Sequence, residues 1–151
     1  MTRYKIIISA IWWGGGLAII AWFLWLTMIP GTFGDYTNEA LDWIIPQLVP
    51  TMTLTGAVAF AQGPASWKEP PAQVRYAFLL CCIISLFYLL LVAADIAHAL
   101  VSVDEHSRGA VDSLASWNKI LGVFQGAAAS AIGVFFVRSA PGAKGRQAGK
   151  D

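Results

Sequence analysis

The sequence YAFLLCCIISLFYLLLVAADIAHALV occupies residues 76–101, and only Asp95 and His98 interrupt its apolar character. Crossing the hydrocarbon core of a bilayer, which is about 30 Å thick, takes about 20 apolar residues in a helix. The stretch lacks the alternation with a period of two that a barrel strand needs, and lipid cannot satisfy the backbone of an open strand. We therefore predict that this stretch is a transmembrane helix.

The whole chain has the composition of an integral membrane protein. Its 151 residues are 57% hydrophobic and 13% charged, with a mean hydropathy of +0.61, whereas about a quarter of the residues in a soluble domain are charged. This composition excludes a water-soluble globule and a disordered chain, and two cysteines are too few for a disulfide framework. The formal net charge of +1 gives no reason to expect a nucleic acid as a partner, so the expected surroundings are the lipid bilayer.

Three further stretches are long and apolar enough to be spans, namely residues 6–29, 41–62 and 116–137. The first has too long an apolar region for a signal peptide and no small-residue cleavage site after it, so we predict a retained helix. The predicted fold class is all-α, an integral membrane bundle of four transmembrane helices in one domain over residues 1–138. Residues 139–151 are basic and rich in glycine, and we predict a disordered cytoplasmic tail.

Basic residues gather on one side of this four-span arrangement, and lysine and arginine at helix ends mark the cytoplasmic side. Arg108 and Lys119 fall on the other side, together with the acidic loops. We therefore predict that both termini are cytoplasmic, because a three-span arrangement would place one terminal basic cluster outside. The short connections favour a bacterial inner (plasma) membrane. The basic residues on the predicted cytoplasmic side are Arg3, Lys5, Lys68, Arg75, Arg138, Lys144, Arg146 and Lys150, and the tryptophans predicted to be interfacial anchors are Trp25, Trp43, Trp67 and Trp117.

Asp95 is the first candidate for a functional residue. An ionised side chain inside a span costs about 2.5 to 3.5 kcal/mol on insertion scales, so it is normally paired or functional. Lys119 lies at a nearly matched depth in residues 116–137, Gln47 reaches a similar level in residues 41–62, and His98 is one turn from Asp95. We predict that these four residues form an intramembrane polar cluster with an Asp95–Lys119 ion pair.

Three of the predicted helices carry a small or polar face, which has two interpretations. In one, the faces line an aqueous conduit that leads inward from the acidic loops to Asp95. In the other, they are helix contacts, because helices in lipid associate through small residues and side-chain hydrogen bonds. The candidate lining residues are Thr51, Thr55, Ser85, Tyr88, Gln125 and Ser130, and the candidate packing residues are Gly122, Gly126 and Gly133.

The sequence offers little support for an enzyme, a metal site or a cofactor. The pieces outside the predicted spans are too short for a catalytic domain, and no span carries a carboxylate pair or a nucleophile beside a base. A haem would need a histidine on a second span, and the adjacent Cys81 and Cys82 lack a second cysteine pair to which they could pass a metal ion. The triplet 14–16, Gly-Gly-Gly, follows no strand and is no phosphate loop, so it indicates a close helix approach or a flexible point. We predict no enzyme activity, no cofactor and no bound metal.

The pattern Trp43-x-x-Pro46-x-x-x-Pro50-Thr51-x-x-Leu54 resembles one seen in uncharacterised small four-helix bacterial membrane proteins, some of them among signalling or defence components. The resemblance covers about a dozen residues of the second predicted helix. It implies a membrane-embedded effector or subunit that perturbs or senses the bilayer, and it transfers no catalytic residue.

Two functions of different classes follow from the sequence. The first is a non-enzymatic structural or interaction subunit of a membrane complex, which associates with itself or with other membrane subunits. The second is an ion- or proton-conducting pore or small transporter that uses Asp95 and Lys119 in a polar intramembrane track.

Overall fold

The computed structural model describes residues 2–60, 72–101 and 108–138, and these residues are helical apart from the connection after the first helix. The helices are α1 (Thr2–Thr27), the short 3-10 helix η1 (Gly34–Tyr36), α2 (Thr37–Phe60), α3 (Ala72–Val101) and α4 (Arg108–Arg138). The prediction of an all-helical chain is confirmed for the described residues. The predicted tail 139–151 and the connections 61–71 and 102–107 lie outside them.

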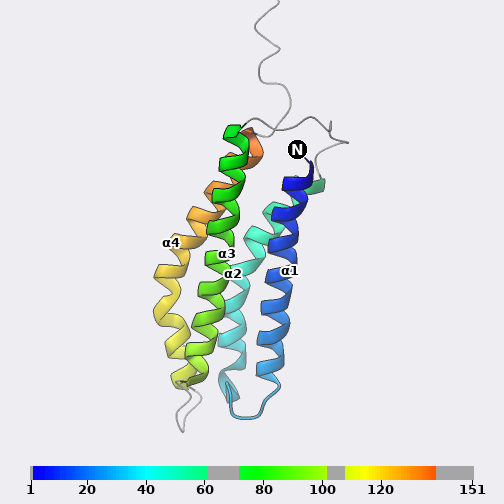
Figure 1. Ribbon diagram of the computed structural model, residues 1–151. Helices are drawn as coiled ribbons and strands as arrows, with labels where there is room; N and C mark the ends of the chain where they lie inside the picture. Colours follow the sequence, from blue (N-terminus) through cyan, green and yellow to red (C-terminus); the bar gives the residue numbers. More distant parts are fainter. Residues whose placement is uncertain (1, 61–71, 102–107, 139–151) are drawn as a thin grey trace, which may run out of the picture.

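The four long helices lie side by side in one bundle, and the chain reverses its direction from each helix to the next (Figure 1). The start of α1 and the end of α4 therefore lie at the same end of the bundle. The helix pairs α1 and α2, and α3 and α4, pack against each other. Contacts of α2 with α4 and of α1 with α3 complete the bundle.

Each helix begins four to eight residues before the apolar stretch that predicted it, whereas α1 ends at Thr27, two residues before its predicted end. The largest difference is in α4, which begins at Arg108 and not at residue 116. Its first turns are polar, and the side chains of Arg108 and Asp112 lie one turn apart with Nε and Oδ2 at 3.8 Å. Hydropathy marks where a helix enters lipid, whereas helical structure continues into polar sequence beyond that point. After α1 the backbone turns at Gly31, whose φ of 90° is accessible to glycine with little strain.

Three helices contain segments long and apolar enough to cross a membrane, namely Tyr4–Thr27, Arg75–Val101 and Arg108–Phe136. Over the described residues α2 is not among them, and its apolar sequence contains Pro46, Gln47 and Pro50 and several threonines. Large apolar side chains also cover the outside of the bundle, as expected of a surface that faces lipid. On α3 these side chains are Leu79, Leu80, Ile83, Leu86, Phe87 and Leu90. The fold is compatible with a membrane protein.

The interior of the bundle is filled by large side chains from all four helices. The largest fully buried ones include Trp12, Phe23, Leu48, Tyr88 and Phe135. Trp43 is also buried, with its ring 6.2 Å from that of Phe23, and its predicted role as an interfacial anchor is therefore wrong. The indole reaches the core because α2 carries it on the same face as the buried residues Ala40 and Gln47, three residues before it and four after it. Trp25 remains exposed at the end of α1, as an anchor would be.

Candidate functional site in the bundle interior

Pro50 removes one backbone hydrogen bond from the middle of α2. In a regular helix the N–H of residue 50 would donate to the carbonyl of Pro46, but proline has no N–H. The side chain of Gln125 supplies the missing donor from α4, with its Nε2 atom 2.8 Å from the carbonyl oxygen of Pro46. The same Nε2 atom lies 3.2 Å from the carbonyl oxygen of Gln47. Gln125 thus links α4 to α2 through hydrogen bonds to two backbone carbonyls.

The side chain of Gln47 joins three helices. The hydroxyl of Tyr88 on α3 lies 2.8 Å from the carbonyl oxygen of Gln47 and 3.0 Å from its Oε1 atom, and donates to these two oxygens. The Nε2 atom of Gln47 donates to Oδ1 of Asn118 on α4 at 3.1 Å. Gln47 and Tyr88 are both buried. Both the nitrogen and the oxygen of the Gln47 side-chain amide are therefore hydrogen-bonded inside the protein.

A second set of buried contacts lies further toward the start of α1. The indole Nε1 of Trp12 donates to Oγ of Ser85 at 3.0 Å, and its ring stacks on Tyr88 with centroids 5.7 Å apart. On α2 the hydroxyl of Thr55 donates within its own helix, to the carbonyls of Thr51 and Met52. Of the predicted lining residues, Thr51, Thr55, Ser85 and Tyr88 are therefore in the interior, where they share hydrogen bonds or pack among apolar side chains.

Asp95 is buried on α3 with 4% of its surface exposed, and neither carboxylate oxygen has a hydrogen-bond partner among the described residues. Lys119 is exposed, and no ion pair joins it to Asp95 in the described part of the chain. The predicted ion pair is therefore wrong. His98 is also exposed, with Nδ1 3.1 Å from Oγ of Ser113, and Gln47 bonds to Tyr88 and Asn118. The predicted four-residue cluster does not form around Asp95.

The ion-pair prediction fails because Lys119 lies on a different face of α4 from the one expected, whereas its depth along the helix was estimated correctly. Ser113 lies beside His98, and the rings of Phe87 and Phe124 lie 5.4 Å apart, which fixes the antiparallel register of α3 and α4. In this register Lys119 is within about one turn of the level of Asp95. Lys119 is two residues from the buried Leu121, however, and at about 100° per residue it lies about 200° around the helix.

The predicted packing glycines make no close contact with another described helix of the same chain. A Cβ atom added at Gly122, Gly126 or Gly133 would meet no other atom within 4 Å. These positions lie outside the α4 stripe that packs in the bundle, and Ser130 is exposed as well. The glycines that allow close approach are Gly15, Gly16 and Gly56, where an added Cβ would lie 2.8, 2.6 and 3.0 Å from Leu89, Met52 and Trp13. The expectation of a close helix approach at the triplet is confirmed for Gly15 and Gly16.

Sequence reasoning missed Trp12 as a member of the interior network, and it missed the contact of Gln125 with Pro46. Trp12 gave no signal, because a tryptophan in an apolar helix fits a lipid-facing surface as well as a core. The contact of Gln125 with Pro46 could have been expected from the sequence. The carbonyl four residues before a mid-helix proline lacks its helical donor, and Pro46 lies four residues before Pro50. Within a membrane such a carbonyl needs a donor from another side chain.

The helical fold, the three candidate spans and the buried polar network define the class as a helical bundle compatible with a membrane protein. Comparison with protein families, curated proteins and solved structures finds no match to this chain.

Proposed function

We propose that the protein is a non-enzymatic integral membrane protein that serves as a structural or interaction subunit of a membrane complex and associates with copies of itself. The observation that carries this proposal is a groove of about 410 Å³ on the outside of the bundle, between α2 and α4. Proline, small and polar residues line it, and helices in lipid associate through small residues and side-chain hydrogen bonds. The lining residues are Pro46, Pro50, Thr51, Leu54, Gly122, Gln125, Gly126 and Ala129.

The open glycines make this face suitable for a second helix. Gly122 and Gly126 are one turn apart on α4 and have no neighbour where a side chain would lie, so the backbone of another helix can approach closely. Packing a helix there would also cover the Gln125 amide and the Pro46 carbonyl, which are partly open to the outside of the bundle. Covering these polar atoms removes them from contact with lipid.

A bulky substitution in the groove tests the association. Gly126→Leu should convert the oligomer to a monomer in mild detergent, measured by sedimentation or light scattering that corrects for bound detergent. Val123→Leu is the matched control, because Val123 is exposed on the same helix outside the groove. A wild-type protein that is already monomeric, or a Gly126→Leu variant with the wild-type mass, would contradict the proposal.

The proposed topology has four spans, with both termini in the cytoplasm of a bacterial cell. Its support is that α2 lies alongside the three candidate spans, while its polar residues Gln47, Thr51 and Thr55 are buried and spared from lipid (Figure 1). The charge distribution of the sequence orients this arrangement. Single cysteines at Gly34 and Ser139, introduced after replacing Cys81 and Cys82 by alanine, should react with an impermeant maleimide from opposite sides. If both cysteines were labelled from the same side of the membrane, the number of spans between residues 34 and 139 could not be odd, which would contradict the four-span topology.

A second candidate function is a cation or proton pathway that uses Asp95. The specific observation in its favour is that the Asp95 carboxylate is buried in the bundle and has no hydrogen-bond partner among the residues that the structure describes. An ionisable side chain inside a span is normally paired or functional. Ser85, Tyr88 and Thr51 place further polar groups in the interior, and Lys119 takes no part. Flux through liposomes should be lost in Asp95→Asn and kept in Lys119→Gln at equal insertion. No flux from the wild-type protein would exclude this candidate.

A further inference from the structure

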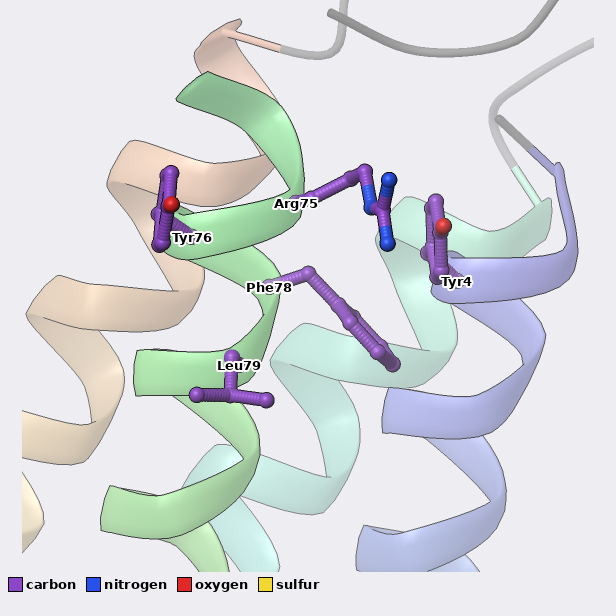
Figure 2. Close-up of a pocket in the computed structure, with 5 residues that line it drawn as sticks. All are labelled: Tyr4, Arg75, Tyr76, Phe78 and Leu79. Atoms are coloured by element: carbon purple, nitrogen blue, oxygen red, sulfur yellow. The ribbon is translucent and has the colours of Figure 1, made fainter. Parts of the chain in front are cut away.

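The starts of α1 and α3 enclose a pocket of about 440 Å³ at the end of the bundle that also holds the end of α4. Its lining consists of Tyr4, Arg75, Tyr76, Phe78 and Leu79 (Figure 2). Figure 2 shows the Arg75 side chain extending from α3 toward Tyr4 on α1, with Phe78 between the two helices. We propose that this pocket binds the phosphate group of an anionic phospholipid, with the Arg75 guanidinium as the cation and the Tyr4 hydroxyl as a second donor.

The donors in the pocket are available for a ligand. Within the residues that the structure describes, neither the Arg75 guanidinium nor the Tyr4 hydroxyl has a hydrogen-bond or ion-pair partner. Guanidinium groups recognise phosphate oxygens through parallel N–H donors. Arg75 also lies in the first turn of α3, where the unpaired backbone N–H groups of the helix favour an anion.

The charge at this end of the bundle suits an anion. Lys5 adds a second cation one residue after Tyr4, with its Nζ atom 5.6 Å from the ring centre of Phe136. Every acidic residue that the structure describes lies in the far half of the bundle, from Asp35, Glu39 and Asp42 to Asp95 and Asp112. No described carboxylate therefore competes with a ligand for Arg75.

The depth of the pocket is that of a lipid headgroup. Tyr4 and Arg75 lie just before the apolar stretches 6–29 and 76–101, which predict two of the spans, and Phe136 lies at the end of the stretch 116–137. These span ends mark the boundary of the hydrocarbon core, where the phosphate groups of the bilayer lie. The proposal thus rests on membrane insertion, which belongs to the proposed function.

The apolar part of the lining distinguishes a lipid from a free phosphate ion. The Phe78 ring lies 4.3 Å from that of Tyr4 and 6.0 Å from that of Phe135, so aromatic rings close the pocket toward the core. Tyr76 and Leu79 are exposed on the outer surface of α3, where acyl chains would run. A cation above an apolar surface matches a phosphate with attached hydrocarbon chains. At the predicted cytoplasmic side, anionic lipids are the expected source of such groups.

The test measures lipid binding to the full chain in a phosphate-free detergent by native mass spectrometry and by thermal unfolding. Phosphatidylglycerol should bind and raise the unfolding temperature, and Arg75→Gln should weaken binding about tenfold, which corresponds to about 1.4 kcal/mol. Tyr4→Phe, which keeps the ring, should weaken binding by a smaller factor. Arg108→Gln removes an exposed cation at the opposite end and should bind as the wild-type protein does.

Each result bears on the proposal. Equal binding by the wild-type protein and Arg75→Gln would overturn it, and protection by inorganic phosphate equal to that by phosphatidylglycerol would replace the lipid by a soluble phosphate compound. Equal binding of phosphatidylcholine would show that the net charge of the lipid is not recognised and would also overturn it. Flotation of the same proteins with liposomes measures insertion separately. Inserted protein that fails to bind phosphatidylglycerol would thus contradict the lipid site and leave the proposed function intact.

Discussion

The side-chain amide of Gln125 donates to the carbonyl of Pro46 at 2.8 Å, in the place of the N–H that Pro50 lacks. The proline and the glutamine lie on different helices and far apart in the sequence, yet they form one structural unit. The missing hydrogen bond at Pro50 is compatible with a membrane interior because α4 supplies the donor. This relationship makes the positions of α2 and α4 depend on each other.

Replacing Gln125 by leucine should destabilise the protein only when Pro50 is present. Gln125→Leu leaves the Pro46 carbonyl without a donor and should lower the free energy of unfolding by about 0.6 to 1.7 kcal/mol, the range for side-chain hydrogen bonds between membrane helices. In a Pro50→Ala background the alanine N–H donates to Pro46, so the loss should shrink toward zero. Unfolding by a denaturing detergent in mixed micelles measures all four variants of the cycle.

Gly126→Ala is the control for this cycle, because an added Cβ there meets nothing within 4 Å, so it should be neutral or stabilising by up to about 1 kcal/mol, equally in both backgrounds. The same loss for Gln125→Leu in both backgrounds would mean that the glutamine stabilises the bundle by some other contact.

Removing the hydroxyl of Tyr88 should weaken the contact between α2 and α3. Tyr88→Phe keeps the stacked ring beside Trp12 but removes the donor to the two oxygens of Gln47. The expected loss in the free energy of unfolding is again about 0.6 to 1.7 kcal/mol, measured in the same micelles. Tyr76→Phe is the matched control, since Tyr76 is 75% exposed and should show no loss. Equal effects of the two changes would contradict a specific role of the Tyr88 hydroxyl.

The sequence was sufficient to predict the depth of each residue but not the direction in which it points. Depth follows from counting residues along an apolar helix, so the levels of Asp95 and Lys119 were close to correct. Direction depends on which face of each helix packs inward, and α4 carries small or polar residues on several faces. Its buried stripe runs through Leu114, Leu121 and Ala128, whereas the glycine stripe that looked like a contact surface remains open. In a soluble protein, the apolar face of an amphipathic helix shows which side packs inward. A helix that faces lipid has apolar residues on its outer face as well as its inner face, so the pattern does not distinguish the two.

The geometry of Asp95 makes a prediction of opposite sign to that of a buried ion pair. If Asp95 and Lys119 formed a buried ion pair, removing one partner would lower the free energy of unfolding by about 3 to 5 kcal/mol. Because Asp95 has no partner in the described residues, Asp95→Asn should leave the free energy of unfolding unchanged or increase it. Combined with Lys119→Gln, the double-mutant cycle should give a coupling energy of no more than about 0.5 kcal/mol. A larger favourable coupling would restore the ion pair.

The glycine triplet on α1 offers three neighbouring positions with different surroundings. Gly14 faces open space, so Gly14→Ala should be neutral or should stabilise the helix by up to about 1 kcal/mol. At Gly16 an added Cβ would lie 2.6 Å from Sδ and 3.2 Å from Cγ of Met52, so the methionine must move within a packed core. Gly16→Ala should therefore lower the free energy of unfolding by about 1 to 3 kcal/mol.

Shortening the methionine separates this steric effect from a change in helix propensity. In a Met52→Ala background the side chain that obstructs position 16 is gone, so adding Gly16→Ala should cause no further loss. Propensity alone would make the alanine substitutions at positions 14 and 16 equivalent, because both lie in the middle of the same helix. If the two single variants unfold at the same denaturant concentration, α1 and α2 do not approach each other at Gly16 as closely as the structure shows. If only Gly16→Ala is destabilised and Met52→Ala cancels the effect, the third glycine of the triplet is required for the close packing of α1 against α2.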